Sequence, residues 1–370
     1  MLVHLALSVH GLVTVDTLPK SFDRPAFQSY WDTMPGTVGR RYAQFATAIA
    51  PLQVEAVRLF AAGKLRRDDA TFAEMSRETL EQLGPTFIKI GQIISVREDI
   101  LGPVWAAELS KLQDGIKPFE GAEALRVIEE SFGSLEAFVS IELQPVAAAS
   151  IAQVHRAVYK VPDGPSVDVA IKVLRPSVRE QVAVDLCVLD RASDLLATWL
   201  PRILPSNQID WRALLRGLSA ALWEEVNLEG EAERQQKFAA NMAPVPRVTV
   251  PAVLASSQQV MVSEWVEGTP LRRVDSKPVL RAAQGLMRDA YCKQLFSDAF
   301  FHADCHGGNL LWVGGPSGED PLDSGELCIL DCGLMVEIEP SDSDNLLRLS
   351  LRHALQRRDS RPRQRGWPRS

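Results

Sequence analysis

The sequence predicts an α+β fold in which a mostly helical first third is followed by short strands and further helices. Three observations lead to this prediction. Apolar residues recur at helical spacing before residue 130, a strand pattern with a period of two starts at Ser166, and the remaining chain alternates short apolar runs with helical ones. With 370 residues, the chain has room for one large bilobal domain with an extension, or for two domains.

The helical region contains four successive segments. Residues 23–64 have helical spacing with a break at Pro35-Gly36, and Asp69–Leu83 follows as a second segment that a Gly-Pro pair ends. A third segment runs through Phe87–Ile94, and Pro103 suits the first turn of a fourth. We therefore expect the region before residue 130 to be mostly helix.

The strand region starts with Ser166–Val173, where apolar and polar residues alternate. Because successive side chains of a strand point to opposite faces of a sheet, Lys172 lies on the face opposite its apolar neighbours. Further short strands are expected at Val260–Val266 and Leu327–Leu330. Helical spacing returns at Leu222–Phe238 and Val279–Phe296.

The composition is that of an ordinary globular protein and argues against several classes. It is 46% hydrophobic and 24% charged, and the net charge of −7 argues against a general nucleic-acid binder. The five cysteines include no CxxC pair, which fits a reducing compartment. No apolar run reaches the length of a membrane-spanning helix, and Met1–Val15 has neither the basic start of a secretory signal nor the Arg and Ser of a transit peptide.

The segment Phe301–Leu310, FHADCHGGNL, carries the clearest chemical signal. Asp304 and Asn309 are five residues apart, which is the spacing of a kinase catalytic loop. In such a loop the Asp orients the attacking hydroxyl and the Asn binds Mg²⁺. Gly307-Gly308 supply the backbone freedom to bring both side chains together.

A zinc site is an alternative interpretation of the same region. Histidine and cysteine are common zinc ligands. The candidates are His302, Cys305, His306 and Cys332. Small residues in loops and strands are the simpler interpretation of these cysteines, and we favour it over zinc.

Three further stretches fit phosphate chemistry. Cys328–Gly333, CILDCG, ends a short strand with Asp331, where a kinase places an Mg²⁺-chelating carboxylate. Lys172 can hold phosphate oxygens if an acid on the helix Glu224–Phe238 fixes its position. The alanine-rich Pro145–His155 stands where a glycine-rich phosphate loop would precede the strand. Each feature alone also has a plain structural interpretation. Asp331 could be an ordinary turn residue, Lys172 could be a charge that keeps an edge strand soluble, and Pro145–His155 could be a turn of small residues.

In chain order, six motifs resemble those of the UbiB/ADCK family of atypical kinases, and plastid and cyanobacterial members are the most similar in appearance. The motifs are FIKIGQ (Phe87–Gln92), AAASIAQVH (Ala147–His155), VAIKVLRP (Val169–Pro176), EEVNLEGEA (Glu224–Ala232), FHADCHGGN (Phe301–Asn309) and LDCG (Leu330–Gly333). The resemblance covers residues 70–345, most of the chain. It implies a bilobal protein-kinase-like fold with an N-terminal helical extension and a truncated C-lobe.

The resemblance also implies roles at matching positions, with ATP and Mg²⁺ as cofactors. The KxGQ extension is expected to pack over the active site, where a substrate protein would otherwise dock. The implied catalytic residues are Asp304, Lys172 and its helix partner Glu231; the nucleotide-binding residues are Lys172, Ala147, Ala148, Ala149 and Ser150; the metal ligands are Asn309 and Asp331; and the regulatory extension uses Lys89 and Gln92 with Glu225.

Several positions depart from the family pattern. The ExD pair reads Glu225-Val226-Asn227, so Asn227 replaces a carboxylate expected to contact the KxGQ region. Ala152 stands where a Gly is usual, and Cys332 replaces the Phe of DFG. The chain after Asp331 is shorter than the resemblance leads one to expect, so apolar surface around Leu346–Leu351 should be exposed.

The predicted domains follow from these motifs. They are an N-terminal helical or irregular segment (1–68), the KxGQ-type helical extension (69–140), a kinase-like N-lobe (141–268), a partial C-lobe with the catalytic and metal-binding loops (269–345), and a basic, disordered tail (346–370).

The implied function is an Mg·ATP-binding atypical kinase or ATPase linked to prenyl-lipid (isoprenoid quinone) metabolism. The alternative is a catalytically weak pseudokinase that acts as a nucleotide-gated scaffold or lipid-binding regulator. A third possibility is a small-molecule kinase of the aminoglycoside or choline type. The KIGQ segment of the extension and the AAAS segment of the alanine-rich loop count against it, because such an enzyme would need neither. The expected partners are ATP and prenyl lipids or a membrane or lipid-body surface, not nucleic acid. The expected location is the chloroplast, and the alternatives are another organelle or a bacterial-type cytoplasmic membrane surface.

Overall fold

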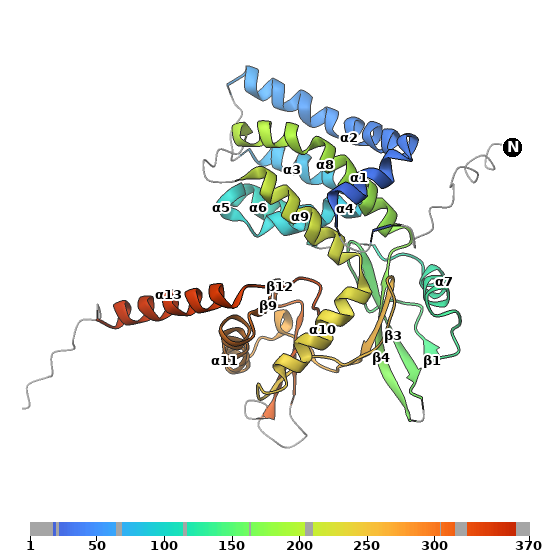
Figure 1. Ribbon diagram of the computed structural model, residues 1–370, viewed down its shortest axis with the longest axis vertical. Helices are drawn as coiled ribbons and strands as arrows, with labels where there is room; N and C mark the ends of the chain where they lie inside the picture. The colour runs from blue at the N-terminus through green and yellow to red at the C-terminus, as the bar shows by residue number, and fades with distance from the viewer. Residues whose placement is uncertain are drawn as a thin grey trace, which may run out of the picture. The chain divides into compact units, whose positions relative to one another are not determined.

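The computed structural model confirms the α+β class and divides the chain into two compact units (Figure 1). It describes residues 18–19, 22–63, 69–113, 117–162, 164–203, 210–303, 305–314 and 324–359. The first unit is Met1–Gly230 with Ala255–Val262, and the second is Glu231–Leu254 with Ser263–Ser370.

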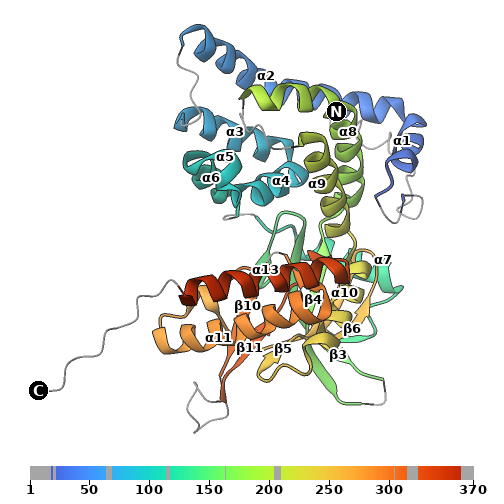
Figure 2. The same ribbon diagram turned by 60° about the vertical axis from the view of Figure 1, so that its left-hand side comes forward.

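The first unit contains a group of helices. They are α1 (Arg24–Asp32), α2 (Pro35–Ala61), α3 (Ala70–Leu83), α4 (Pro85–Ser95), α5 (Glu98–Leu101), α6 (Pro103–Ser110), the 3₁₀ turn η2 (Lys111–Gln113), α8 (Val178–Ile203) and α9 (Trp211–Glu225). Helix α2 packs on α3 and α8, and α4 packs on α3 and α8 (Figure 2). The predicted helical segments are confirmed, and the Asp69 carboxylate caps α3 by accepting from the Phe72 N–H at 2.9 Å.

A buried ion pair holds these helices together. The Arg41 guanidinium of α2 donates to the Asp185 carboxylate of α8 at 2.5 Å. The Thr86 hydroxyl of α4 donates to the same carboxylate at 2.6 Å, and Arg41 also donates to the carbonyl of Leu83, the last residue of α3. Asp185 is fully buried, and this desolvation raises the pKa of its carboxyl although the guanidinium and the hydroxyl lower it.

A six-stranded sheet follows in the chain, with strand order β1-β3-β4-β7-β6 and β2 paired with β3. Its strands are β1 (Phe138–Ile141), β2 (Ala147–Ala148), β3 (Ala152–Lys160), β4 (Ser166–Leu174), β6 (Val253–Ser256) and β7 (Val260–Glu264). Strands β3 and β4 form a long antiparallel hairpin. Val169, Ile171 and Val173 of β4 are fully buried in a cluster with residues of helix α7 (Gly121–Phe132), which confirms the alternating pattern expected for this strand.

The helix expected over Leu222–Phe238 is two helices, so this prediction was wrong in one respect. Helix α9 ends at Glu225, and α10 (Leu228–Met242) begins after Asn227. The Asn227 side chain accepts from the Gly230 N–H at 3.2 Å, an N-terminal capping contact that starts a new helix. The apolar spacing continues across the break and therefore conceals it.

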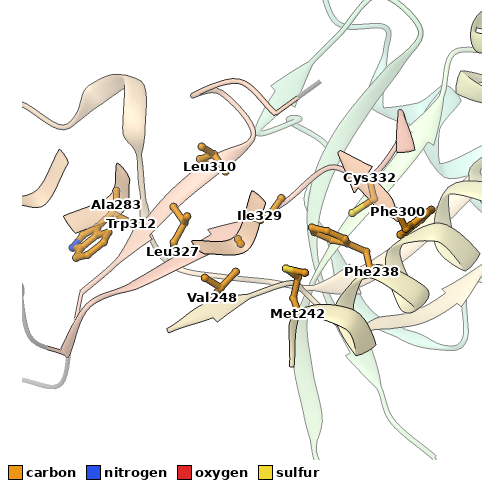
Figure 3. Packing of buried hydrophobic residues seen from close by; sticks show 11 residues of the cluster. Phe238, Met242, Val248, Ala283, Phe300, Leu310, Trp312, Leu327, Ile329 and Cys332 are labelled. Atoms are coloured by element: carbon orange, nitrogen blue, oxygen red, sulfur yellow. The ribbon is translucent and has the colours of Figure 1, made fainter. Parts of the chain in front are cut away.

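The second unit combines two small sheets with helices. Its elements are α10, β5 (Val248–Thr249), β8 (Thr269–Pro270), the 3₁₀ turn η3 (Leu271–Arg273), α11 (Lys277–Lys293), the π-helical turn η4 (Gln294–Asp298), β9 (Phe300–His302), β10 (Leu310–Val313), β11 (Glu326–Ile329), β12 (Met335–Glu337) and α13 (Pro340–Asp359). One sheet has strand order β5-β11-β10-β8, and the other pairs β12 with β9. Figure 3 shows the apolar cluster between these sheets and α10, in which Phe238, Leu327 and Ile329 are fully buried.

The end of the described chain differs from the expected disordered tail at 346–370. Helix α13 continues to Asp359, because its Leu, Arg, Ala and Gln residues favour helix despite their weak apolar periodicity. Residues 360–370 lie outside the described residues. Leu346, Leu349 and Leu351 are 42%, 62% and 55% exposed, which confirms the expectation of exposed apolar surface here.

Candidate functional site

The two predicted metal ligands lie at the same end of one β-hairpin. Asn309 directly precedes β10, and Asp331 follows β11 by two residues. The strands pair antiparallel with Leu310 opposite Ile329, and the Leu330 N–H donates to the Asn309 carbonyl at 2.9 Å. The structure therefore brings Asn309 and Asp331 together, as the spacing predicted.

The turn after β11 is fixed by hydrogen bonds around Asp331. The Asp331 carboxylate accepts from the Gly333 N–H at 2.8 Å. The buried His302 ring donates through Nε2 to the Asp331 carbonyl. His302 is itself held, because its N–H donates to the Gln294 side chain at 2.9 Å and its carbonyl accepts from the Tyr291 hydroxyl at 2.6 Å.

The His302 ring thus holds the backbone of Asp331, whereas in the sequence His302 was only a zinc candidate. A histidine two residues before the proposed catalytic Asp304 was the available signal. Asp304 lies outside the described residues, so its predicted role stays a prediction. The adjacent Ala303 N–H donates to the Leu334 carbonyl at 3.0 Å, which joins this loop to the turn after Asp331.

The zinc interpretation finds no support in the part of the chain that the structure describes. No group of three or more His, Cys, Asp or Glu side chains suited to a metal occurs among these residues. The His306 ring accepts from the Gly308 N–H at 3.0 Å, and Cys332 is buried in the apolar cluster of the second unit. Asn309 and Asp331 instead offer amide and carboxylate oxygens, which suit a hard cation such as Mg²⁺.

The KxGQ residues of α4 bind neighbouring elements of the first unit. The Lys89 ammonium lies 3.0 Å from the Glu225 carboxylate of α9, and both side chains are mostly buried, as the resemblance implied. The Gln92 amide donates to the Leu112 carbonyl at 2.8 Å. Between them, Gly91 packs so closely that a Cβ there would lie 2.3 Å from a methyl of Leu112. The extension is therefore a tightly packed element.

The alanine-rich segment forms a closed hairpin. Ala147 and Ala148 pair with β3, and the Ala149 N–H donates to the Ala152 carbonyl at 2.8 Å. Ser150, at the tip, is buried, and its hydroxyl lies 3.5 Å from the Gln92 side chain. The segment pairs with β3, the neighbour of β4 in the sheet, and internal hydrogen bonds fix its conformation, while its phosphate-binding role stays a prediction.

The predicted phosphate lysine and its acidic partner belong to different units. Lys172 lies on β4 opposite Val154 and is half-buried on the face away from the α7 core. Glu231 lies in the first turn of α10 and is 1% exposed. Their ion pair stays a prediction.

Among the described residues, the structure contains no helix both long and apolar enough to cross a lipid bilayer.

The first unit combines a group of helices with a six-stranded sheet and its alanine hairpin, and the second unit carries Asn309 and Asp331 at one end of the β10–β11 hairpin. This α+β architecture is the one expected of the kinase-like class. The match of residues 111–362 to the ABC1 atypical kinase-like domain is consistent with this class. Because that match covers more than half of the chain, the chain belongs to the ABC1, or UbiB/ADCK, family of atypical kinases.

Curated relatives support the assignment. The chain is 34% identical over 286 residues to "Protein ACTIVITY OF BC1 COMPLEX KINASE 8, chloroplastic" of Arabidopsis thaliana. This match covers 74% of this chain and 36% of the relative. It is 34% identical over 289 residues to "Probable protein kinase UbiB" of Enterobacter sp. (strain 638). This match covers 75% of this chain and 50% of the relative. The chain thus spans half or less of the length of these relatives.

A solved structure is also similar. The Rv3197–erythromycin complex from Mycobacterium tuberculosis has 25% sequence identity and a TM-score of 0.47, and the match covers 69% of this chain and 60% of that chain.

Proposed function

We propose that this protein binds Mg·ATP and uses it as an atypical kinase or ATPase in prenyl-lipid (isoprenoid quinone) metabolism. The observation that carries the proposal is the placement of Asn309 and Asp331 at one end of the β10–β11 hairpin, with His302 holding the backbone of Asp331. An amide oxygen and a carboxylate at one end of a hairpin would suit a hard cation such as Mg²⁺, which would neutralise charge on nucleotide phosphates.

Each site residue has a distinct part in the proposed reaction. Asp331 and Asn309 would hold Mg²⁺, which when bound neutralises charge on the β- and γ-phosphates. Lys172 would contact α- and β-phosphate oxygens, with Glu231 fixing its ammonium. Asp304 would orient the attacking hydroxyl or water. The chain's main contribution is then to position charged groups.

The names of relatives support the compartment and the pathway. One relative is named as chloroplastic, and the other is named as the kinase UbiB. We propose a chloroplast location, and prenyl lipids or the surface of a membrane or lipid body as partners. The phosphoryl acceptor is either a water molecule or a hydroxyl-bearing substrate. Release of inorganic phosphate from ATP would show that the acceptor is water.

The test is ATP turnover by the full chain with the variant Asp331→Asn. Asparagine keeps an oxygen that can accept from the Gly333 N–H, so the turn is kept while the charge is lost. We expect turnover to fall at least about 100-fold, as when a transition-state charge partner is removed. Removal of Mg²⁺ with a chelator should abolish turnover in the wild type, and added Mg²⁺ should restore it.

The matched control is Asp168→Asn on β4. The Asp168 side chain is 50% exposed and pairs only loosely with Arg156 at 3.3 Å, so its loss should leave turnover unchanged. Equal turnover in Asp331→Asn and wild type would defeat the proposed role of Asp331.

A nucleotide-gated scaffold without turnover is a second candidate function. The observation that favours it is the closed alanine hairpin, because the Ala149 N–H bonds the Ala152 carbonyl and so is engaged within the protein. A glycine-rich loop instead offers such amides to phosphate. A thermal shift with Mg·ATP in the absence of phosphate release would select this function over the first.

A further inference from the structure

Arg175, the residue after β4, lies at the tip of the alanine hairpin. Its N–H donates to the Ile151 carbonyl at 2.8 Å. Its guanidinium donates through Nε and Nη2 to the Ala149 carbonyl at 3.2 and 3.1 Å. Backbone and side chain of one residue therefore hold both sides of the hairpin turn.

The same guanidinium reaches a second segment. Nη2 donates to the Lys117 carbonyl at 2.6 Å, and the guanidinium carbon lies 5.6 Å from the centroid of the Phe119 ring. Burial lowers the pKa of Arg175, although a guanidinium stays protonated at physiological pH. A planar cation with several donors suits two carbonyls and an aromatic face at once.

A buried glutamine makes a second link between the hairpin and the segment that contains Phe119. Gln153 lies opposite Ala148 in the β2–β3 pairing and is 1% exposed. Its side chain accepts from the Phe119 N–H at 3.0 Å and donates to the Phe119 carbonyl at 3.3 Å. The buried His155 ring continues this network, because it lies 2.8 Å from the Gln153 amide and donates to the Glu142 carbonyl at 2.7 Å.

The segment that contains Lys117 and Phe119 joins the KxGQ extension to α7. At its start, the Leu112 carbonyl accepts from the Gln92 amide of α4. Leu112 is 3% exposed and packs in a cluster with residues of α3, α4 and α6. The extension therefore binds Leu112 of η2, and the hairpin binds residues 117–119, while residues 114–116 lie outside the described residues. The extension also meets the hairpin directly, because the Ser150 hydroxyl lies 3.5 Å from the Gln92 side chain. All these residues belong to the first unit.

We propose that Arg175 is a positioning residue that ties the tip of the alanine hairpin to segment 117–119, so that the extension sets the conformation of the hairpin and thereby nucleotide affinity. The nucleotide part of this inference rests on the proposed function. The tie between Arg175, Ala149 and Lys117 does not.

The physical consequence is preorganisation. A hairpin held by Arg175 has its conformational entropy already removed before a ligand binds, so the ligand does not have to order it. Loss of the tie should increase the opening of the hairpin and weaken nucleotide binding. Lysine keeps the charge but cannot span both carbonyls in one plane, so Arg175→Lys should resemble Arg175→Ala rather than the wild type.

The first measurement is hydrogen exchange of the full chain, followed in peptides that cover 117–120 and 147–152. In Arg175→Ala and Arg175→Lys, we expect the Ala149 and Phe119 amides to exchange at least about tenfold faster, because hydrogen bonds from a charged donor are lost. Peptides within Val169–Val173 of β4 should be unchanged. Gln92→Ala removes the bond of the extension to Leu112 and its contact with Ser150, so it should accelerate exchange at 117–120 and at 147–152.

Arg156→Ala is the matched control, because Arg156 lies on the neighbouring strand and its side chain is 34% exposed. It should leave exchange at the hairpin unchanged. Unaltered exchange in Arg175→Ala would overturn the tie. Equal acceleration in β4 would also overturn it, because the change would then be global unfolding.

The second measurement is the Kd of a fluorescent ADP analogue with Mg²⁺. We expect an increase of about three- to tenfold in Arg175→Ala and Arg175→Lys and no change in Arg156→Ala. Faster exchange at the hairpin with unchanged Kd would overturn the link to nucleotide affinity. If the wild type binds no nucleotide, the proposed function fails, and the exchange data alone decide the tie.

Discussion

At the residue scale, Asp331 is positioned through its backbone as much as through its side chain. Its carbonyl accepts from the His302 ring, and its neighbour Leu330 donates to the Asn309 carbonyl. His302 is 1% exposed and stacks edge-on against Phe238, with ring centroids 6.3 Å apart. A small rotation of this turn would move the carboxylate, so His302 should matter for turnover without contacting the nucleotide.

The variant His302→Leu tests this positioning. Leucine fills a similar apolar space but leaves the buried Asp331 carbonyl without its ring donor. We expect the rate of ATP turnover to fall about 10- to 100-fold, because displacement of a metal ligand by a fraction of an ångström weakens its contacts. The Mg²⁺ concentration for half-maximal turnover should rise.

Phe238→Leu is the control for lost packing, because it removes the ring against His302 and keeps the hydrogen bond to Asp331. It should lower stability while leaving the Mg²⁺ dependence of turnover unchanged. If both variants shift the Mg²⁺ dependence equally, His302 acts through packing alone.

The placement of Asn309 and Asp331 at one end of a hairpin could be predicted, because each stands in a short local pattern beside a strand, while their role as metal ligands stays a prediction. It did not identify the role of His302, whose hydrogen-bond partner lies 29 residues further along the chain. Arg175 was missed for the same reason, since its side-chain acceptors are backbone carbonyls 26 and 58 residues away. Residue type says little about such contacts, because every residue has a carbonyl.

At the element scale, the close packing of α4 depends on one glycine. A Cβ at Gly91 would lie 2.3 Å from a Leu112 methyl and 3.0 Å from a Leu80 methyl. Leu112 is 3% exposed, so its side chain has little room to move. The glycine of the KIGQ motif is therefore needed for packing against α3 and η2.

Gly91→Ala should lower the free energy of unfolding by about 1–3 kcal/mol, since overpacking of a well-packed site has that effect. Gly217→Ala in α9 is the matched control, because it too lies inside a helix but a Cβ there meets nothing within 4 Å. That variant should stabilise the protein by up to about 1 kcal/mol through helix propensity. Urea unfolding measures both, and a stable Gly91→Ala would contradict the packing argument.

Long elements with regular spacing were predicted well, and their junctions were not. Strand β4 was expected over Ser166–Val173 and spans Ser166–Leu174, because strict alternation has one simple structural interpretation. The break between α9 and α10 was missed, because the apolar spacing persists while the Asn227 side chain supplies the cap. A cap is a single polar contact, and the pattern of apolar residues does not report it.

At the scale of the whole molecule, the order of motifs was more informative than any one of them. Six motifs in chain order indicated the family, and the ABC1 match over 111–362 confirms it. The composition of residues 346–359 was misleading, because Arg-rich sequence without apolar periodicity is compatible with both disorder and helix α13. The prediction for residues 360–370 concerns residues outside the described ones. Leu346, Leu349 and Leu351 of α13 are exposed, as expected.

Stability of the whole chain should depend on the buried pair Arg41–Asp185, which joins α2 to α8 with Thr86 of α4. Arg41→Ala leaves a buried carboxylate without its cation, which destabilises a protein by about 3–5 kcal/mol. Burial already raises the pKa of Asp185 in the folded chain, and loss of the guanidinium raises it further.

The direction of the pH effect follows from this raised pKa. When the pKa of a carboxyl is higher in the folded chain than in the unfolded chain, protonation of that carboxyl stabilises the folded chain. This stabilisation is complete at pH values below the unfolded-state pKa, and it is lost as pH rises through the folded-state pKa. The free energy of unfolding of Arg41→Ala, measured in urea, should therefore fall below that of the wild type by the least near pH 5 and by the most near pH 8. The difference near pH 8 should be about 3–5 kcal/mol. In Arg41→Ala, the further substitution Asp185→Asn should remove most of this pH dependence. Arg191→Ala, which breaks the surface pair with Asp32, is the control and should lower the free energy of unfolding only slightly at every pH. A deficit for Arg41→Ala that is equal at pH 5 and pH 8 would show that the carboxylate is not the group left destabilised, and that the arginine supports α2 by packing and by its bond to Leu83 instead.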